Sequence, residues 1–334
     1  MLGNRVIEAA DTTGVISPYF IIPKASGKFR FILNLKDVNE SIVYSHFKMQ
    51  RIHDAMNLLE VGGHMAKLDL STAYDCVFVH LDDRIILQFQ YNDVTYQFRC
   101  FPNGLSEAPI LFTRLLDPIK FILGKLGIKF VSYLDDMLLM HQDPSVLRCQ
   151  VSLVVQLFVN LGFVINSEKS IATPTQSLNF LGFNLDSVLM KVSLPGKKLV
   201  KIQSTCSNLC SRSLVSRRDL AKLLGHFTAA SVPIVPAPLH YREIQRLVIR
   251  VADTKRWDQL IQLSSLSRIE LSWWIHQAPD WNGSPIRLPA VDIILKTDAS
   301  LIGWGAVSQG LSAQGPCESN QQKLYHINTL ETWL

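Results

Sequence analysis

Two adjacent aspartates stand in apolar surroundings, where an unpaired charge is costly. Asp135 and Asp136 interrupt residues 130–140 (FVSYLDDMLLM), which otherwise read as a buried β-hairpin. Asp is disfavoured in strands, and neighbouring carboxylates near an apolar core raise each other's pKa unless a cation neutralises them. Divalent metal ions at the tip of the hairpin would resolve this conflict. An isolated Asp-Asp pair is, however, more often an ordinary exposed turn.

Asp69 supplies a second acidic site in a matching context. It lies in residues 67–74 (KLDLSTAY), within a strand that reads as buried and just before a Ser-Thr pair typical of a helix start. Two strand-borne acidic sites can share metal ions, and two Mg²⁺ about 3.5–4 Å apart would activate a primer hydroxyl and stabilise the leaving pyrophosphate. The pattern therefore predicts nucleotidyl transfer, although the spacing is equally compatible with other Mg²⁺-dependent phosphoryl transfer.

The elements that position these acids are indicated by hydrophobic spacing and turn residues. Strand patterns at residues 19–23 and 29–33 predict a hairpin, and another strand pair is predicted between residues 178 and 192. A last strand is predicted at residues 293–297, ending at Asp298. Helical spacing predicts helices at residues 52–59, 105–125, 144–161, 216–230 and 241–252.

Length and composition indicate a globular protein with more than one domain. The chain has 334 residues, of which 48% are hydrophobic and 18% charged, and this excludes a disordered or low-complexity protein. No run approaches the ~18–20 apolar residues that a membrane span needs, so we expect neither a signal peptide nor an anchor. Six cysteines at irregular spacings fit reduced thiols. We therefore expect an intracellular protein, cytoplasmic or nuclear and not secreted.

Positive charge is concentrated in one segment. Residues 196–256 carry twelve Lys or Arg against three acids, a net charge of +9, whereas the whole chain has +5 and the remainder therefore −4. Such a concentration is typical of a surface that binds nucleic-acid phosphates, although a solvated helical face explains most single charge runs. The candidate nucleic-acid-binding residues are Lys197, Lys198 and Lys201.

Six ordered blocks of the sequence resemble reverse transcriptases of retroelements. Residues 133–136 (YLDD) resemble the YxDD box of that family, and residues 67–74 resemble its first catalytic block. Residues 217–230 and 270–274 resemble the connecting region of DIRS-like or related LTR-type elements. The chain is thus identified as a fragment of a polyprotein with reverse transcriptase and ribonuclease H. The other blocks are the fingers hairpin at residues 17–39, the nucleotide-closing block at 101–109 (FPNGLSEAP), a fourth block at 161–169 (LGFVINSEK) and the primer grip at 179–183 (NFLGF).

The resemblance implies an α+β fold: a right-hand polymerase with fingers, palm and thumb, followed by a truncated ribonuclease H-like α/β domain. Residues 1–192 would form the fingers and palm, residues 193–288 a basic helical thumb or connection, and residues 289–334 the incomplete ribonuclease H-like domain. Asp298 and Glu331 would be the first two acids of that domain. Because its later acids are missing, we expect no ribonuclease H activity from this chain.

The family match also assigns roles to single residues. Asp69, Asp135 and Asp136 would be catalytic and, with the backbone of Leu70, would hold two Mg²⁺ ions, for which Mn²⁺ is a possible replacement. Phe180, Leu181 and Gly182 would position the primer end. The incoming nucleotide would be bound by Lys24, Arg30, Ala73, Tyr74, Asn103, Gly104 and Lys169.

Several of these roles have a simpler alternative, and so does the function. Tyr74 would be the steric gate against a 2′-hydroxyl, but a core tyrosine fits the same pattern. Lys169 would protonate the leaving pyrophosphate, but a solvent-facing lysine is equally compatible. Asn103 departs from the Gln or aromatic residue that is common at this point of the family.

The expected function is that of an RNA-directed DNA polymerase. Its partners would be an RNA or DNA template, a primer and deoxynucleoside triphosphates, with no membrane. The alternative is a truncated or domesticated retroelement remnant that binds nucleic acid without catalysis. The sequence leaves the oligomeric state open.

Overall fold

A computed structural model describes residues 1–23, 27, 29–43, 47–250, 256–287, 293–300 and 303–316. Lys24 and Glu331, both predicted to be site residues, lie outside the described residues. The chain divides into two units, Met1–Ile286 and Arg287–Leu334. The border expected between residues 192 and 193 falls inside the first unit and stays a prediction.

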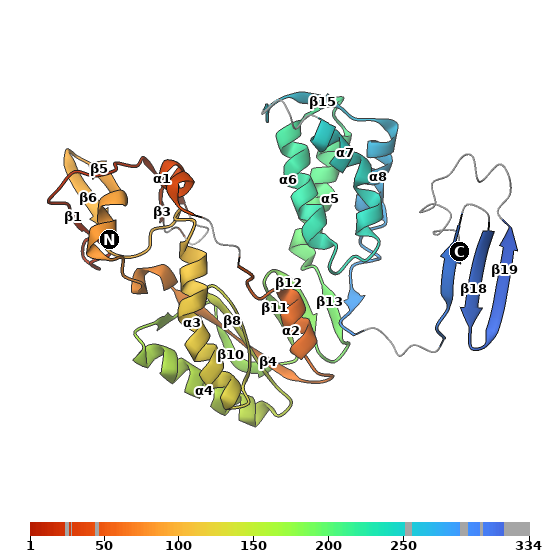
Figure 1. The fold of residues 1–334 in the computed structure, drawn as a ribbon, viewed down its shortest axis with the longest axis horizontal. Helices are drawn as coiled ribbons and strands as arrows, with labels where there is room; N and C mark the ends of the chain where they lie inside the picture. The colour runs from red at the N-terminus through yellow and green to blue at the C-terminus, as the bar shows by residue number, and fades with distance from the viewer. Residues whose placement is uncertain are drawn as a thin grey trace. The chain divides into compact units, whose positions relative to one another are not determined.

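An antiparallel sheet in the strand order β10-β4-β8-β7 carries the acidic residues (Figure 1). Side chains alternate between its two faces, as β-strand geometry requires. Met137 and Leu139 pack into the cluster formed with helices α3 and α4, while Leu138 and Met140 belong to the cluster on the opposite face. The elements are β4 (His64–Ser71), α3 (Ala108–Lys125), β7 (Lys129–Tyr133), β8 (Asp136–His141), α4 (Pro144–Asn160), β9 (Val164–Ile165), which pairs with β4, and β10 (Ile171–Thr175).

Helix α4 begins at the position that the sequence predicts, because its first turn is capped. The Asp143 carboxylate accepts hydrogen bonds from the amides of Ser145 and Val146, and Pro144 occupies the first turn, where a missing N–H has no cost. The resulting helix covers the sheet next to β8 and β10.

The N-terminal part of the chain forms a hairpin and a small sheet around a core of their own. Strands β2 (Tyr19–Pro23) and β3 (Phe29–Leu33) form the predicted hairpin with the predicted bounds. The Phe31 ring lies 4.9 Å from the rings of both Tyr19 and Phe89 between centroids, which joins the hairpin to the sheet. The other elements here are β1 (Ile7–Ala9), α1 (Lys36–Ser41), η2 (Leu81–Ile86), β5 (Gln88–Tyr91) and β6 (Val94–Phe98), with the strand order β1-β6-β5.

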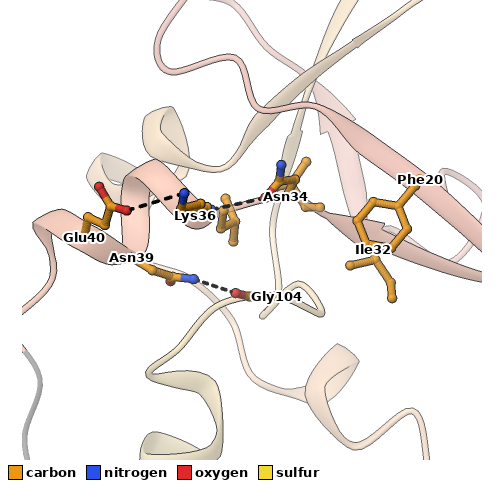
Figure 2. Close-up of a pocket in the computed structure, with 9 residues that line it drawn as sticks. Phe20, Ile32, Asn34, Lys36, Asn39, Glu40 and Gly104 are labelled. Carbon is orange, nitrogen blue, oxygen red and sulfur yellow. Dashed lines mark hydrogen bonds and ion pairs between the residues drawn. The ribbon is translucent and has the colours of Figure 1, made fainter. Parts of the chain in front are cut away.

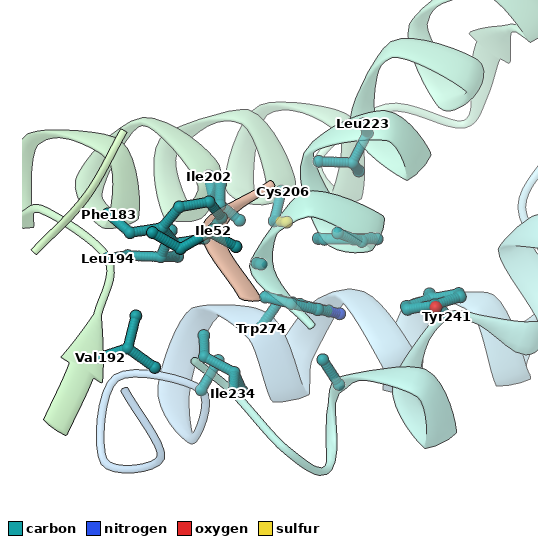
Figure 3. Close-up of a cluster of buried hydrophobic side chains, with 14 of the residues drawn as sticks. Ile52, Phe183, Val192, Leu194, Ile202, Cys206, Leu223, Ile234, Tyr241 and Trp274 are labelled. Carbon is teal, nitrogen blue, oxygen red and sulfur yellow. The ribbon is translucent and has the colours of Figure 1, made fainter. Parts of the chain in front are cut away.

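Beyond residue 195, helices pack around buried aromatic rings, part of which Figure 3 shows. Trp274 is fully buried, and its ring stacks on Phe227 at a centroid distance of 4.1 Å. Its indole N–H donates to the His240 carbonyl, so its polar atom is satisfied. The same hydrophobic cluster continues through Leu194 to Leu138 of the sheet, so the helices and the sheet share a core.

The remaining elements of the first unit are α2 (Ile52–Leu58), β11 (Ser177–Phe180), β12 (Phe183–Asp186), β13 (Lys191–Ser193), α5 (Gly196–Cys210), β14 (Leu214–Ser216), α6 (Arg217–Ala230), η3 (Ala237–His240), α7 (Arg242–Arg250), β15 (Leu260–Gln262), α8 (Ser265–His276) and β16 (Ser284–Pro285). Among them, α2, α6 and α7 match predicted helices with ends that differ by a few residues, and β11 and β12 lie at the predicted strand pair, whereas helices α5 and α8 were not predicted. Strands β11, β12, β13 and β16 form one sheet, and β14 pairs with β15.

The second unit contains an antiparallel sheet of β17 (Lys296–Ala299), β18 (Gly303–Ser308) and β19 (Leu311–Pro316). Asp298 lies in β17, opposite Gly305 of β18. Across both units, the described residues contain no helix that is long and apolar enough to cross a membrane.

Candidate active site

The three aspartates meet at one end of the sheet because of the register of its strands. Asp69 in β4 stands opposite Asp136 in β8. The two-residue turn before Asp136 consists of Leu134, which has a left-handed φ of 53°, and Asp135. The Leu70 amide donates to the Asp135 carbonyl over 2.8 Å, which ties this turn to β4. Strand pairing thus brings together acids that are far apart in the sequence.

Asp69 is the most buried of the three, with 4% of its surface exposed. Its amide donates to Ser170 Oγ at 3.0 Å, and its carbonyl accepts from the Asn166 amide at 2.8 Å, so the segment after β9 fixes its backbone. Its Oδ1 atom makes no hydrogen bond and lies 3.5 Å from Lys169 Nζ. The structure therefore brings Lys169 to the acidic site, with a largely exposed side chain.

Asp136 and Asp135 differ in how their charges are balanced. Asp136 Oδ1 lies 2.7 Å from Lys67 Nζ, in an ion pair that lacks the angles of a hydrogen bond. No ion pair to Asp135 forms within the described residues. Burial is the main reason why the pKa of the Asp135 carboxyl is raised, and the charges of Asp136 and Asp69 add to it. A backbone hydrogen bond and the charge of Lys169 act in the opposite direction.

These carboxylates supply part of the ligand set that a divalent cation needs. Asp69 Oδ1 and Asp136 Oδ1 are buried without a hydrogen bond, and three like charges lie close together. In the part of the chain that the structure describes, no three His, Cys, Asp or Glu side chains are grouped as they would be around one ion. The protein thus offers an incomplete ligand set, which oxygens of substrate or water would have to complete.

Tyr74 lies beside the acidic residues, after a sharp turn. Thr72 has a left-handed φ of 49°, and the short helix η1 (Ala73–Cys76) follows it, with Ala73 buried. The half-buried Tyr74 ring packs edge-on against Phe112 at 5.7 Å between centroids. Burial, with a contribution from the Asp135 charge, raises the pKa of Tyr74 to about 12. Its hydroxyl is therefore neutral at physiological pH and able to donate a hydrogen bond.

The predicted nucleotide-closing block is clamped to the N-terminal part of the chain. Gly104 has a φ of +120°, and a Cβ added there would lie 2.2 Å from the Leu33 carbonyl oxygen, so only glycine fits. Asn39 in α1 donates to the Gly104 carbonyl, as Figure 2 shows, and accepts from the Ser106 amide, both at 2.9 Å. The Asn103 carbonyl accepts from the Leu33 amide at 3.2 Å. No sequence pattern signalled Asn39, because its partners lie 65 and 67 residues away.

An open pocket of about 440 Å³ lies next to this clamp (Figure 2). Phe20 and Ile32 of the hairpin provide apolar surface, and Asn34 and Lys36 provide polar atoms. Such a surface can take up a flat, partly polar group such as a nucleobase. Arg30, which the sequence assigns to the nucleotide site, is exposed on β3.

The predicted primer grip includes the turn between β11 and β12. Phe180 is fully buried in the core, and Leu181 packs against that core while partly buried. The turn itself consists of Leu181 and Gly182, with φ values of 48° and 79°. Lys198 Nζ, from α5, donates to the Gly182 carbonyl at 2.9 Å, a contact that the sequence did not predict. The other two predicted nucleic-acid contacts are exposed on α5: Lys197 and Lys201.

Comparison with known proteins identifies one matching family model. Residues 22–185 match the family described as reverse transcriptase (RNA-dependent DNA polymerase). The match contains the three aspartates, Tyr74 and the closing block, and it ends within β12.

Similar whole proteins are polyproteins of viruses and transposons. The chain is 25% identical over 170 residues to the Pro-Pol polyprotein of Simian foamy virus type 1, a match that covers 51% of this chain and 14% of that polyprotein. It is 22% identical over 351 aligned positions to the enzymatic polyprotein of Cauliflower mosaic virus (strain Strasbourg), with 99% of this chain and 48% of that polyprotein covered. The chain thus spans less than half the length of these relatives.

Solved structures of foamy viral protease-reverse transcriptase share the fold. The complex with dsDNA superposes with a TM-score of 0.71 at 19% identity, over 98% of this chain and 67% of that one. The complex with an RNA/DNA hybrid gives a TM-score of 0.70 at 18% identity, over 98% and 43%. The similarity extends over nearly the whole chain.

Proposed function

Residues 22–185 are a reverse transcriptase domain, and we propose that the chain that carries it is an RNA-directed DNA polymerase which extends a primer with deoxynucleotides by two-metal nucleotidyl transfer. The observation that carries this proposal is the register of β4 and β8, which sets Asp69 against Asp136 with Asp135 on the adjoining turn. Three carboxylates at one end of a sheet suit metal-assisted phosphoryl transfer.

The acidic residues form the catalytic centre in this proposal. Asp69, Asp135 and Asp136, next to the backbone of Leu70, would hold two Mg²⁺ ions, or Mn²⁺ in their place. When bound, these ions would activate the primer 3′-hydroxyl and stabilise the leaving pyrophosphate. Lys169, whose ammonium is 3.5 Å from Asp69 Oδ1, would donate a proton to the leaving group.

The nucleotide would lie between the acids and the N-terminal hairpin. Tyr74, half-buried beside Asp135, is suited to meet the sugar and to exclude a 2′-hydroxyl. Arg30, exposed on β3, would bind the triphosphate, and Lys24 would do likewise. The clamped backbone of Asn103 and Gly104 would form the facing wall.

The template and primer would lie along the sheet and the basic helices. The similar foamy viral proteins were solved with dsDNA and with an RNA/DNA hybrid, which supports the same partners here. The turn at Leu181 and Gly182 would position the primer end, and lysines of α5 would bind phosphates. Several cysteines are free thiols, which supports a reducing, intracellular location; they are Cys76, Cys100, Cys149, Cys206 and Cys210.

Primer extension on an RNA template with Mg²⁺ tests the proposal. We expect extension by the wild-type chain and none by Asp69→Asn, with template–primer binding within about threefold of wild type, because metal ligation acts mainly on the transition state. Asp82→Asn, which changes a highly exposed aspartate in η2, is the matched control and should extend normally. Equal extension by Asp69→Asn and wild type would contradict the assignment.

A further inference from the structure

Lys67 reaches Asp136 diagonally across two paired strands. Lys67 stands opposite Leu138, and Asp69 stands opposite Asp136, so Asp136 is the diagonal neighbour of Lys67. Alternation places Lys67 on the same face of β4 as Asp69. Diagonal neighbours on one face are about 7–8 Å apart, a gap that a lysine side chain spans. The observed distance between Lys67 Nζ and Asp136 Oδ1 is 2.7 Å.

This ion pair is shielded from solvent. The side chains are 17% exposed for Lys67 and 25% exposed for Asp136, whereas that of Lys169, the other lysine at the site, is 64% exposed. A partly buried ammonium needs a partner, because unpaired charge is costly away from water. Lys67 is therefore held by Asp136 in a shielded ion pair, whereas the Lys169 side chain, 3.5 Å from Asp69, is mostly in solvent.

The three carboxylates of the site therefore differ in whether a fixed positive charge balances them. Lys67 balances Asp136, and Lys169 lies near Asp69. Within the described residues, Asp135 has no ion pair, although it lies close enough to the other two acids for their charges to act on it. Negative charge without a fixed counter-ion is thus concentrated on Asp69 and Asp135.

We propose that Lys67 is a positioning residue of the active site: it holds the Asp136 carboxylate and balances its charge, which leaves Asp69 and Asp135 as the carboxylates that bind metal. The inference rests on the proposed function and changes one part of it: of the three carboxylates proposed above to hold Mg²⁺, it keeps Asp69 and Asp135 as metal ligands and gives Asp136 a supporting role. It assigns a role to Lys67, a residue of the first catalytic block (residues 67–74) that cannot itself bind a metal ion because it carries a positive charge. In this role Asp136 does not bind metal: it pairs with Lys67 and stands opposite Asp69 in the β4–β8 pairing.

Metal binding without nucleic acid tests this inference directly. The titration of each purified variant with Mn²⁺, followed by electron paramagnetic resonance, gives an affinity that does not depend on polymerase activity. In Lys67→Met the Asp136 charge is no longer balanced, so we expect Mn²⁺ to bind about threefold or more tightly. Lys67→Arg keeps the charge and should bind Mn²⁺ more nearly as wild type does.

A double variant separates the roles of the two partners. Lys67→Met combined with Asp136→Asn removes the pair without changing the net charge, so Mn²⁺ affinity should return to within about threefold of wild type. A loss of about tenfold or more in the double variant would identify Asp136 as a metal ligand and overturn the inference. Lys67→Met with wild-type Mn²⁺ affinity would also overturn it.

The control variant is Lys129→Met. Lys129 lies on strand β7 of the same sheet and forms an ion pair with Glu60. Its replacement therefore also removes a sheet lysine and breaks an ion pair, but that ion pair does not involve any of the three aspartates of the site. Lys129→Met should leave Mn²⁺ affinity unchanged. Circular dichroism verifies the fold of each variant, and Lys67→Gln replaces Lys67→Met if the latter does not fold. Absence of primer extension by the wild-type chain would contradict the proposed function alone, since the Mn²⁺ measurements would still decide the role of Lys67.

Discussion

Replacing Lys197 and Lys201 together by alanine should weaken the salt dependence of template–primer binding by the amount expected for two phosphate contacts. Both side chains are exposed on α5 and are four residues apart, so they share one side of the helix. The other side is buried through Ile202 and Cys206. The substitutions should therefore change charge without disturbing the core.

Of the three candidate lysines, two are counted as phosphate contacts, because Lys198 is hydrogen-bonded to the Gly182 carbonyl. Each lost phosphate contact reduces the slope of log affinity against log salt by about 0.9 on B-form duplex, so two contacts correspond to about 1.8. Between 50 and 200 mM salt, that slope change alters the ratio of wild-type to variant affinity by roughly tenfold. Lys198 donates to the Gly182 carbonyl, so Lys198→Ala should change the slope less and affect primer positioning more.

Fluorescence anisotropy of a labelled template–primer, measured across a salt series, provides the slopes. The matched control is Lys120→Ala with Lys125→Ala, which removes the same charge from α3. Two template sequences should respond alike, because phosphate contacts position nucleic acid without reading its bases. A double variant of Lys197 and Lys201 with the wild-type slope would refute the reasoning, since it would show that these lysines face solvent in the complex.

Three further variants test other parts of the structure. Tyr74→Val should lower the preference for deoxyribonucleotides over ribonucleotides by about tenfold or more, measured as a ratio of kcat/KM values, and an unchanged ratio in an active variant would leave Tyr74 a packing role only. Gly104→Ala places a Cβ 2.2 Å from the Leu33 carbonyl oxygen and should raise the KM for nucleotide, whereas Gly124→Ala meets nothing within 4 Å and should not; equal KM values would contradict the clamp. Trp274→Ala removes a fully buried ring and should lower the free energy of unfolding by about 3–5 kcal/mol, measured by circular dichroism in urea; a loss below about 1 kcal/mol would contradict its place in the core.

Local patterns in the sequence predict much of the fold. The hairpin of β2 and β3 has the predicted bounds because apolar alternation and a polar turn define it locally. Helix α4 is predicted within one residue because Asp143 and Pro144 mark its start. The predicted strand at residues 293–297 was displaced, since β17 spans Lys296–Ala299 and its bounds are set by pairing with β18. The apolar residues Ile293 and Ile294 match the sequence pattern of a buried strand, but both side chains are exposed in the structure.

Contacts between distant segments could not be predicted from the sequence. The Lys67–Asp136 ion pair depends on the register of β4 and β8, which no local pattern specifies. Asn39 reads as an ordinary polar residue until folding brings the closing block to it. The fully buried side chain of Phe180 likewise follows from the packing of the shared core rather than from the motif that contains it.

The most direct test of the account is the rate of a single nucleotide addition to a primer on an RNA template, measured under single-turnover conditions for wild type and Asp135→Asn. Metal-assisted transfer through Asp135 predicts a rate about a thousandfold lower in the variant, because a metal ion supplies several kcal/mol of transition-state stabilisation. Template–primer affinity should stay within about threefold, since it comes mainly from phosphate contacts. An Asp135→Asn variant that adds the nucleotide at the wild-type rate would contradict the central claim.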